Sequence, residues 1–138
     1  MSKFTRGPTC IDRGPRMSSA ASQTYARNSQ TTATPREIEA QALLKAARQL
    51  QDVLENWTGP GSHLNSAILF NRKLWSIFMN DAINDDNPLA ADIRQNIANI
   101  GIFVMKQTVE IQTNPAPEKL KSLIDINCNL AAGLSGRA

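Results

Sequence analysis

The sequence is poor in aromatic residues, which are enriched in β-strands. Aromatic residues make up 5% of the 138 residues, and Tyr25 is the single tyrosine. Alanine, leucine, isoleucine, asparagine and glutamine instead fill long stretches that contain no glycine. This composition favours helices over strands, and the length fits one domain with an ordinary core. We therefore predict an all-α fold in a single domain.

Sequence signatures of the common enzyme and cofactor classes are also missing. The chain has no GxxxxGK[ST], GxGxxG, CxxC or GxSxG segment, which serve phosphate binding, dinucleotide binding, redox chemistry and hydrolysis. His63 is the only histidine, and nothing near it completes a triad or a metal site. The aspartates between 81 and 92 lack the glycine and glutamate of a calcium loop. We expect no enzyme activity, metal, cofactor or small-molecule substrate.

Long apolar runs and cysteine patterns are absent as well. The longest apolar run, residues 100–105, is far too short for a bilayer core of about 30 Å, and the N-terminus has no apolar block typical of a signal peptide. Cys10 and Cys128 have no metal-ligand spacing and form no framework of several disulfides. These features predict a cytoplasmic protein that does not insert into membranes.

The formal net charge of +3 lies in one short segment. Residues 1–16 carry four basic and one acidic side chain, whereas residues 17–138 carry eleven of each and are neutral. A neutral folded part lacks the charge that phosphate contacts require, so we expect residues 17–138 not to bind nucleic acid. Because residues 1–16 contain Gly-Pro twice and no hydrophobic periodicity, we predict a disordered extension or a cloning remnant that precedes a native start at Met17.

Apolar residues at steps of three and four predict four main helices in residues 17–138. The first begins with a capping box at Thr34 and Glu37, with Pro35 in its first turn, and ends before 59–61. The second is predicted from Ser62, as N-cap, to about 83. The third runs from Asn87, as N-cap, to about 112, and the fourth covers about 117–132.

Short connections between these helices predict an antiparallel bundle, and residues 18–30 have the propensity for a short additional N-terminal helix. Asn71 falls within an apolar stripe and needs hydrogen-bond partners if it is buried. Gly101 interrupts the third helix, where it permits a close approach of another helix. The buried stripe of that helix is predicted to contain Ile93, Ile97, Ile100, Val104 and Ile111.

Three segments, in this order and spacing, resemble the flagellar biosynthesis regulator FlaF family of alphaproteobacteria. They are TPREIEAQALL from Thr34, NRKLWSIF from Asn71 and NPLAADIRQNIANIG from Asn87. The resemblance covers roughly residues 17–135. It implies a cytoplasmic protein needed for flagellin production and filament assembly, acting as a flagellin-binding export chaperone opposite FlbT, a repressor of flagellin translation. It supplies no catalytic residues.

A helical bundle with a wide apolar helix can bind an amphipathic partner helix in a groove. Our candidate contacts for flagellin are Trp75, Phe78, Ile97 and Phe103, although the same residues also fit the description of a core. The alternative function is post-transcriptional regulation, in which the protein acts on flagellin mRNA directly or through FlbT.

Overall fold

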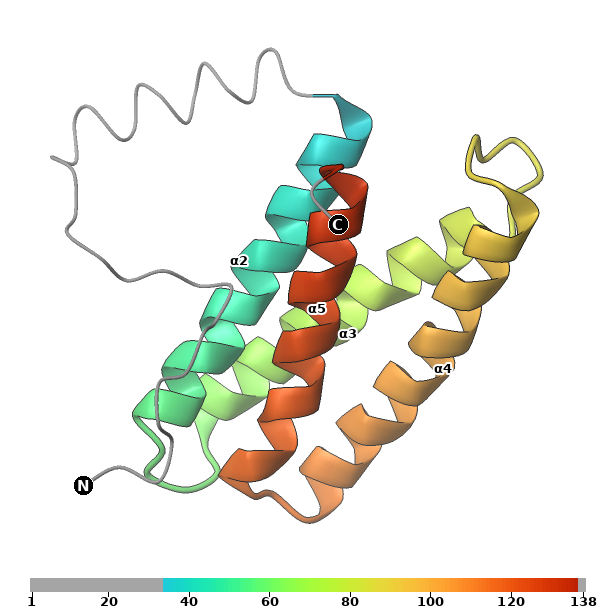
Figure 1. The fold of residues 1–138 in the computed structure, drawn as a ribbon. Coiled ribbons are helices and arrows are strands. Elements are labelled where there is room, and N and C mark those ends of the chain that lie inside the picture. Colours follow the sequence, from blue (N-terminus) through green and yellow to red (C-terminus); the bar gives the residue numbers. More distant parts are fainter. Residues whose placement is uncertain (1–33, 137–138) are drawn as a thin grey trace, which may run out of the picture.

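The computed structural model describes residues 34–136 as an all-α bundle of four long helices (Figure 1). The elements are α2 (Pro35–Glu55), α3 (Ser62–Ala82), α4 (Ala91–Thr113), the short 3₁₀ helix η1 (Pro117–Lys119) and α5 (Leu120–Leu134). Consecutive helices run in opposite directions, as the short connections require. The predicted extension at 1–16 and the predicted short helix at 18–30 lie outside the described residues.

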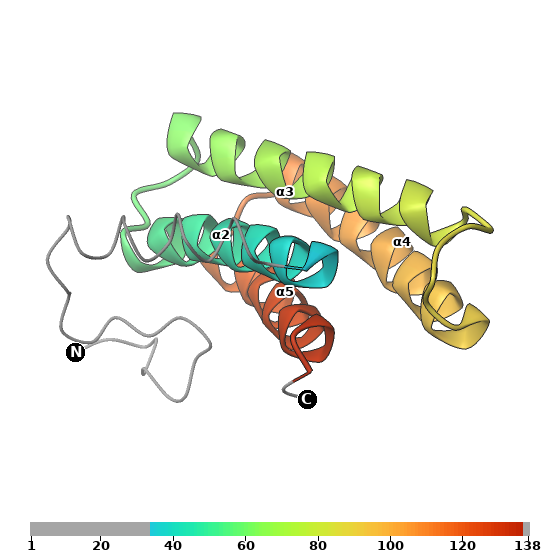
Figure 2. The ribbon, with the colours of Figure 1, turned by 90° about the horizontal axis from the view of Figure 1, so that it is seen from above.

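The four helices pack as two pairs that share one core. α2 packs along α5, α3 packs along α4, and α2 also contacts α3, whereas α4 and α5 touch each other only slightly (Figure 2). Every long helix contributes side chains to this core. The largest fully buried apolar side chains are Trp75, Leu43, Leu50, Ile68, Ile111, Leu120, Leu123 and Val104.

The start of α2 has the capping box that the sequence predicted. The Thr34 hydroxyl accepts a hydrogen bond from the Glu37 backbone N–H (3.2 Å), and the Glu37 carboxylate accepts one from the Thr34 N–H (2.9 Å). Pro35 occupies the first turn, where its missing N–H costs no hydrogen bond. The first turn of α2 is therefore held in place by local interactions alone.

The predicted N-caps of the next two helices were wrong, although α3 does start at Ser62. Ser62 is the first residue of α3 rather than its N-cap, which is Gly61 and has no side-chain hydrogen bond. α4 begins at Ala91, with Ala90 as N-cap, so Asn87 and Pro88 belong to the preceding loop. Asn87 stabilises that loop instead, because its side chain donates to the Asp81 carbonyl and accepts from the Leu89 N–H.

A chain of buried amide and indole groups joins α3 to α5 across the core. The Trp75 indole N–H donates to Asn127 Oδ1 (2.9 Å), and Asn127 Nδ2 donates to Asn71 Oδ1 (2.7 Å). Because an indole can only donate, it fixes the orientation of the Asn127 amide and, through it, that of Asn71. Asn71 was predicted to need partners if buried, and it has one through Oδ1, whereas its Nδ2 has no partner within the described part of the chain.

Gly101 lies at a close approach of α4 to α3, as predicted. A Cβ atom built on Gly101 would lie 2.5 Å from Met79 Cγ and 2.6 Å from Met79 Sδ. The predicted stripe of α4 is otherwise largely confirmed, since Ile97, Val104 and Ile111 are buried and Ile100 is partly buried. Ile93 is the exception, with 44% of its surface exposed.

Replacing Asn127 with alanine should destabilise the fold strongly. The substitution leaves the Trp75 indole N–H and Asn71 Oδ1 buried without partners, which costs about 2–4 kcal/mol of unfolding free energy. Urea denaturation of the full chain measures this change. Asn129→Ala, on the exposed side of the same helix, is the matched control and should stay within about 0.5 kcal/mol of wild type. Equal effects of the two substitutions would contradict a stabilising role for the hydrogen bonds that join Trp75, Asn127 and Asn71.

Replacing Gly101 with valine should destabilise the fold by about 1–3 kcal/mol, because the new side chain displaces Met79 from the contact between α3 and α4. Gly133→Val is the control, since no atom lies within 4 Å of a Cβ built on Gly133. That control should leave the thermal midpoint nearly unchanged. An equal loss in both variants would show that backbone propensity, rather than close packing, determines the effect.

Candidate functional site

The structure places the four predicted partner contacts in different environments. Trp75 is completely buried, and Phe78 and Ile97 are each 7% exposed, whereas Phe103 is 44% exposed. The Trp75 and Phe78 rings pack edge to face with centroids 5.7 Å apart. Contact of these residues with flagellin stays a prediction, and only Phe103 offers a partner a large surface without movement of the core.

Phe103 lies on the side of α4 that faces the start of α5. Gln107, one turn further along α4, donates a hydrogen bond to the Lys119 carbonyl (3.1 Å), and Glu110 forms an ion pair with Lys119 Nζ (2.8 Å). Residues three, four and seven positions apart share a helix face, so Phe103 lies on the same side as these two residues. Ile100 and Ile93 extend that side toward the start of α4.

This row of apolar residues, Ile93, Ile100 and Phe103, is here called the α4 flank. Near Lys119 the flank adjoins α5, but the two helices separate toward the start of α4 and the end of α5 in both ribbon views (Figures 1 and 2). Ile93 and Phe103 each leave 44% of their surface exposed, and Ile100 is partly buried. The flank therefore presents a half-covered apolar helix face.

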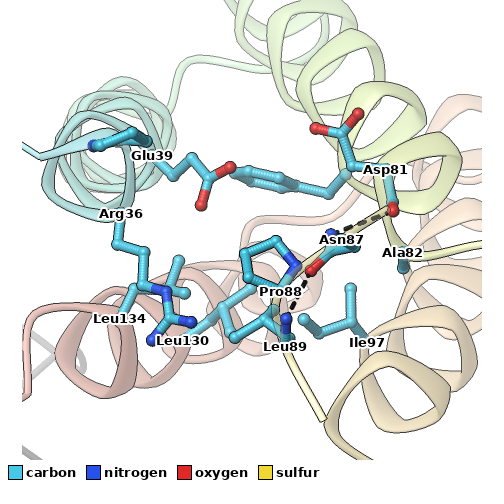
Figure 3. Close-up of a pocket in the computed structure, with 12 residues that line it drawn as sticks. Arg36, Glu39, Asp81, Ala82, Asn87, Pro88, Leu89, Ile97, Leu130 and Leu134 are labelled. Carbon is cyan, nitrogen blue, oxygen red and sulfur yellow. Dashed lines mark hydrogen bonds between the residues drawn. The ribbon is translucent and has the colours of Figure 1, made fainter. Parts of the chain in front are cut away.

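A pocket of about 120 Å³ lies where α4 and α5 have separated (Figure 3). Its lining comes from the start of α2, the end of α3, the loop before α4, and α4 and α5 themselves. We call it the open-end pocket. The apolar part of its lining includes Phe78, Leu89, Ile97, Leu130 and Leu134.

The loop that forms one side of the open-end pocket is held by hydrogen bonds at both of its ends. Asn87 bonds to the Asp81 carbonyl and the Leu89 N–H, as described above. From the first turn of α4, Arg94 Nη1 donates to the carbonyls of Ala82 and Asn84, each at 3.3 Å. Ala82 is the last residue of α3 and Asn84 lies just after it, where carbonyls have no helical partners and a cation is favourable. The pocket is therefore built on a fixed loop.

Charged residues occupy the rim of the open-end pocket. Glu39 extends from α2 toward α3, and Arg36 extends toward Leu130 and Leu134 of α5 (Figure 3). Partial burial raises the pKa of the Glu39 carboxyl above its ordinary value of 4.5; the negative charge of Asp81 adds to this shift, and Arg36 opposes it. Neither water nor a neighbouring cation therefore fully stabilises the negative charge of the Glu39 carboxylate.

A second, larger pocket of about 470 Å³ lies at the opposite end of α2, around the connection to α3. Trp57, Val53 and the only histidine, His63, contribute to its lining. Within residues 34–136, His63 has no hydrogen bond to a carboxylate or to a nucleophile, and no group of three or more metal-ligating side chains occurs. The geometry of this pocket therefore indicates no specific chemistry.

Sequence reasoning missed the charged rim of the open-end pocket. Arg36 and Glu39 lie in the TPRE segment, and Asn87 and Leu89 lie in the NPLA segment. Each of the two segments has the pattern of a helix start. That pattern gives no indication that the two segments lie side by side in the folded protein. In the third segment, Asn71 and Trp75 do not line this pocket. Their side chains form the buried hydrogen bonds with Asn127 in the core.

The family model described as flagellar protein FlaF matches residues 21–134. The chain belongs to the FlaF family. No curated protein and no solved structure matches it. In the part of this FlaF family member that the structure describes, no helix combines the length and the apolarity that crossing a bilayer requires.

Replacing Glu39 with glutamine should stabilise this FlaF family member at neutral pH. The folded-state pKa of Glu39 lies above its ordinary value of 4.5, so the folded state binds this proton more tightly than the unfolded state. Stability therefore falls as pH rises from about 4.5 through the raised pKa, and Glu39→Gln removes this loss.

We expect a higher thermal midpoint for Glu39→Gln than for wild type at pH 7, and a difference that shrinks below pH 4.5, the ordinary pKa. Calorimetry across this pH range measures both. Glu118→Gln, at an exposed carboxylate in η1, is the matched control and should show no such trend. A pH-independent gain in Glu39→Gln would contradict the electrostatic cause.

Proposed function

We propose that this FlaF family member binds flagellin in the cytoplasm and supports its synthesis and export as a chaperone, without catalysing a reaction. The family assignment gives a flagellar protein, and the resemblance to FlaF supplies flagellin as the partner. The observation that carries the proposal within the structure is the α4 flank, an apolar helix face that the chain's own helices leave half exposed.

The shape of this region suits an amphipathic helix. A helix that lays its apolar face between two separated helices contacts both of them, and residues at its three- and four-residue steps provide the anchors. Here the α4 flank supplies one side, and Ile126 and Leu130, one turn apart on α5 and only partly buried, supply the other. Affinity would come from burial of apolar surface, at about 25 cal/mol per Å².

The charge of the described residues disfavours direct binding to mRNA, the alternative function. Residues 34–136 carry nine basic and eleven acidic side chains, a net charge of −2. Phosphate binding requires a basic surface whose affinity decreases steeply with salt. Any effect on flagellin translation is therefore better assigned to an indirect route, in which the protein acts through flagellin or through FlbT.

The test is complex formation between the full chain and purified flagellin in the absence of RNA. Size-exclusion chromatography should show a stoichiometric complex, and calorimetry should give its affinity. Two separate elution peaks at micromolar concentrations, together with no heat of binding, would overturn the proposal. A gel shift with flagellin mRNA at low salt, in the absence of flagellin, would support the alternative.

Phe103→Glu should weaken flagellin binding by at least about tenfold, or ~1.4 kcal/mol, because it places a charge on the α4 flank. The matched control is Ile102→Glu. Ile102 is 50% exposed, next to Phe103 and on the same helix, but it points about 100° away around the axis. Ile102→Glu should change the affinity by less than about twofold. Equal losses would assign the interface to another side of α4.

A further inference from the structure

The open-end pocket has the size of a single side chain. Its volume is about 120 Å³. Pockets for metabolites and cofactors span about 300–1,000 Å³. The pocket is therefore too small for such a ligand and fits one side chain inserted by a partner.

The walls and the rim of the pocket differ in character. Phe78, Leu89 and Ile97 line it with apolar atoms, and Leu130 and Leu134 of α5 complete this lining. At the rim, Glu39 has no hydrogen bond or ion pair with any other described residue. Lysine and arginine combine an apolar stem with a cationic tip. These side chains therefore match both the walls and the rim.

The surroundings of the pocket strengthen this charge preference. The end of the bundle formed by residues 34–40 and 78–94 carries six carboxylates and two guanidinium groups, a net charge of −4. Arg94 uses Nη1 on the carbonyls that end α3, and Arg36 forms no ion pair with Glu39 within the described residues. The acidic end is therefore not neutralised by its own cations.

We propose that the open-end pocket anchors one lysine or arginine of an amphipathic flagellin helix, with the stem against Phe78, Ile97 and Leu130 and the cation at Glu39. This inference rests on the proposed function and adds the chemistry that fixes the position of the bound helix. The apolar face of the helix lies along the α4 flank, and the anchor residue determines how far the helix extends toward the acidic end. Asp81 and the neighbouring loop aspartates attract the cation during the approach.

The test compares wild type, Glu39→Gln and Glu118→Gln for binding to purified flagellin at low and high salt. Glutamine has nearly the shape of glutamate, and Glu39→Gln is expected to stabilise the fold, so lost binding cannot arise from unfolding. We expect Glu39→Gln to bind about tenfold more weakly at low salt and to lose most of the salt dependence. Glu118→Gln removes the same charge about 18 Å or more away along α5 and should bind as wild type does.

A second measurement identifies the anchor on the partner. Each lysine and arginine of the bound flagellin segment is replaced with glutamine, and each variant is combined with Glu39→Gln in a double-mutant cycle. One flagellin position should be strongly non-additive with Glu39, whereas additive effects at every position would overturn the anchor.

The outcomes separate the two proposals. No binding of flagellin to wild type overturns the proposed function and the anchor with it. Equal binding by wild type and Glu39→Gln overturns the anchor alone and leaves flagellin binding established. Tighter binding by Glu39→Gln would also overturn it, because it would indicate that the basic segment 1–33 of the chain itself occupies the acidic end and competes with flagellin.

Discussion

The hydrogen-bond chain from Trp75 through Asn127 to Asn71 is the interaction on which the arrangement of the four helices depends. α3 and α5 are not packed along each other, since each has its main contacts with another helix. The buried amides nevertheless link them through the centre of the core. Apolar packing alone tolerates several rotations and shifts of a helix, whereas two buried hydrogen bonds of defined geometry are satisfied in one arrangement only. These hydrogen bonds therefore determine which faces of α3 and α5 point into the core.

With α3 and α5 fixed in this way, the open end of the bundle follows from how the other helices attach. α4 approaches α3 closely because Gly101 has no side chain to separate it from Met79. At its C-terminal half α4 is also tied to Lys119 by Gln107 and Glu110. Its N-terminal half has no comparable tie to α5, so the two helices separate there (Figure 1). The α4 flank and the open-end pocket are consequences of this one-sided attachment.

Local sequence signals predicted the helices well because they act within a few residues. The capping box at Thr34 and the apolar spacing of Leu43 and Leu50 need no knowledge of the rest of the chain. The start of α4 was misplaced because Asn87 has the side chain of an N-cap, yet its partners lie on Asp81 and Leu89 in the loop. The rim of the pocket could not be predicted, because Glu39 and Asp81 are 42 positions apart in sequence and meet only through the packing of α2 on α3. The exposure of Ile93 could not be predicted either. Its spacing is that of a core residue, but α5, the helix that would cover it, has separated from α4 at that point (Figure 1).

The donor-only indole has a consequence for how such sequences can change over time. If Trp75 became phenylalanine, Asn127 Oδ1 would lose its donor and could turn over to serve Asn71, which would in turn reverse the roles of both amides. If Asn127 became leucine, the indole N–H and Asn71 would both be left in apolar surroundings. Asn127 is the central member, so its replacement removes both hydrogen bonds, whereas replacement of Trp75 or Asn71 removes one and leaves the other. A family member that departs at position 127 should therefore depart at positions 71 and 75 as well.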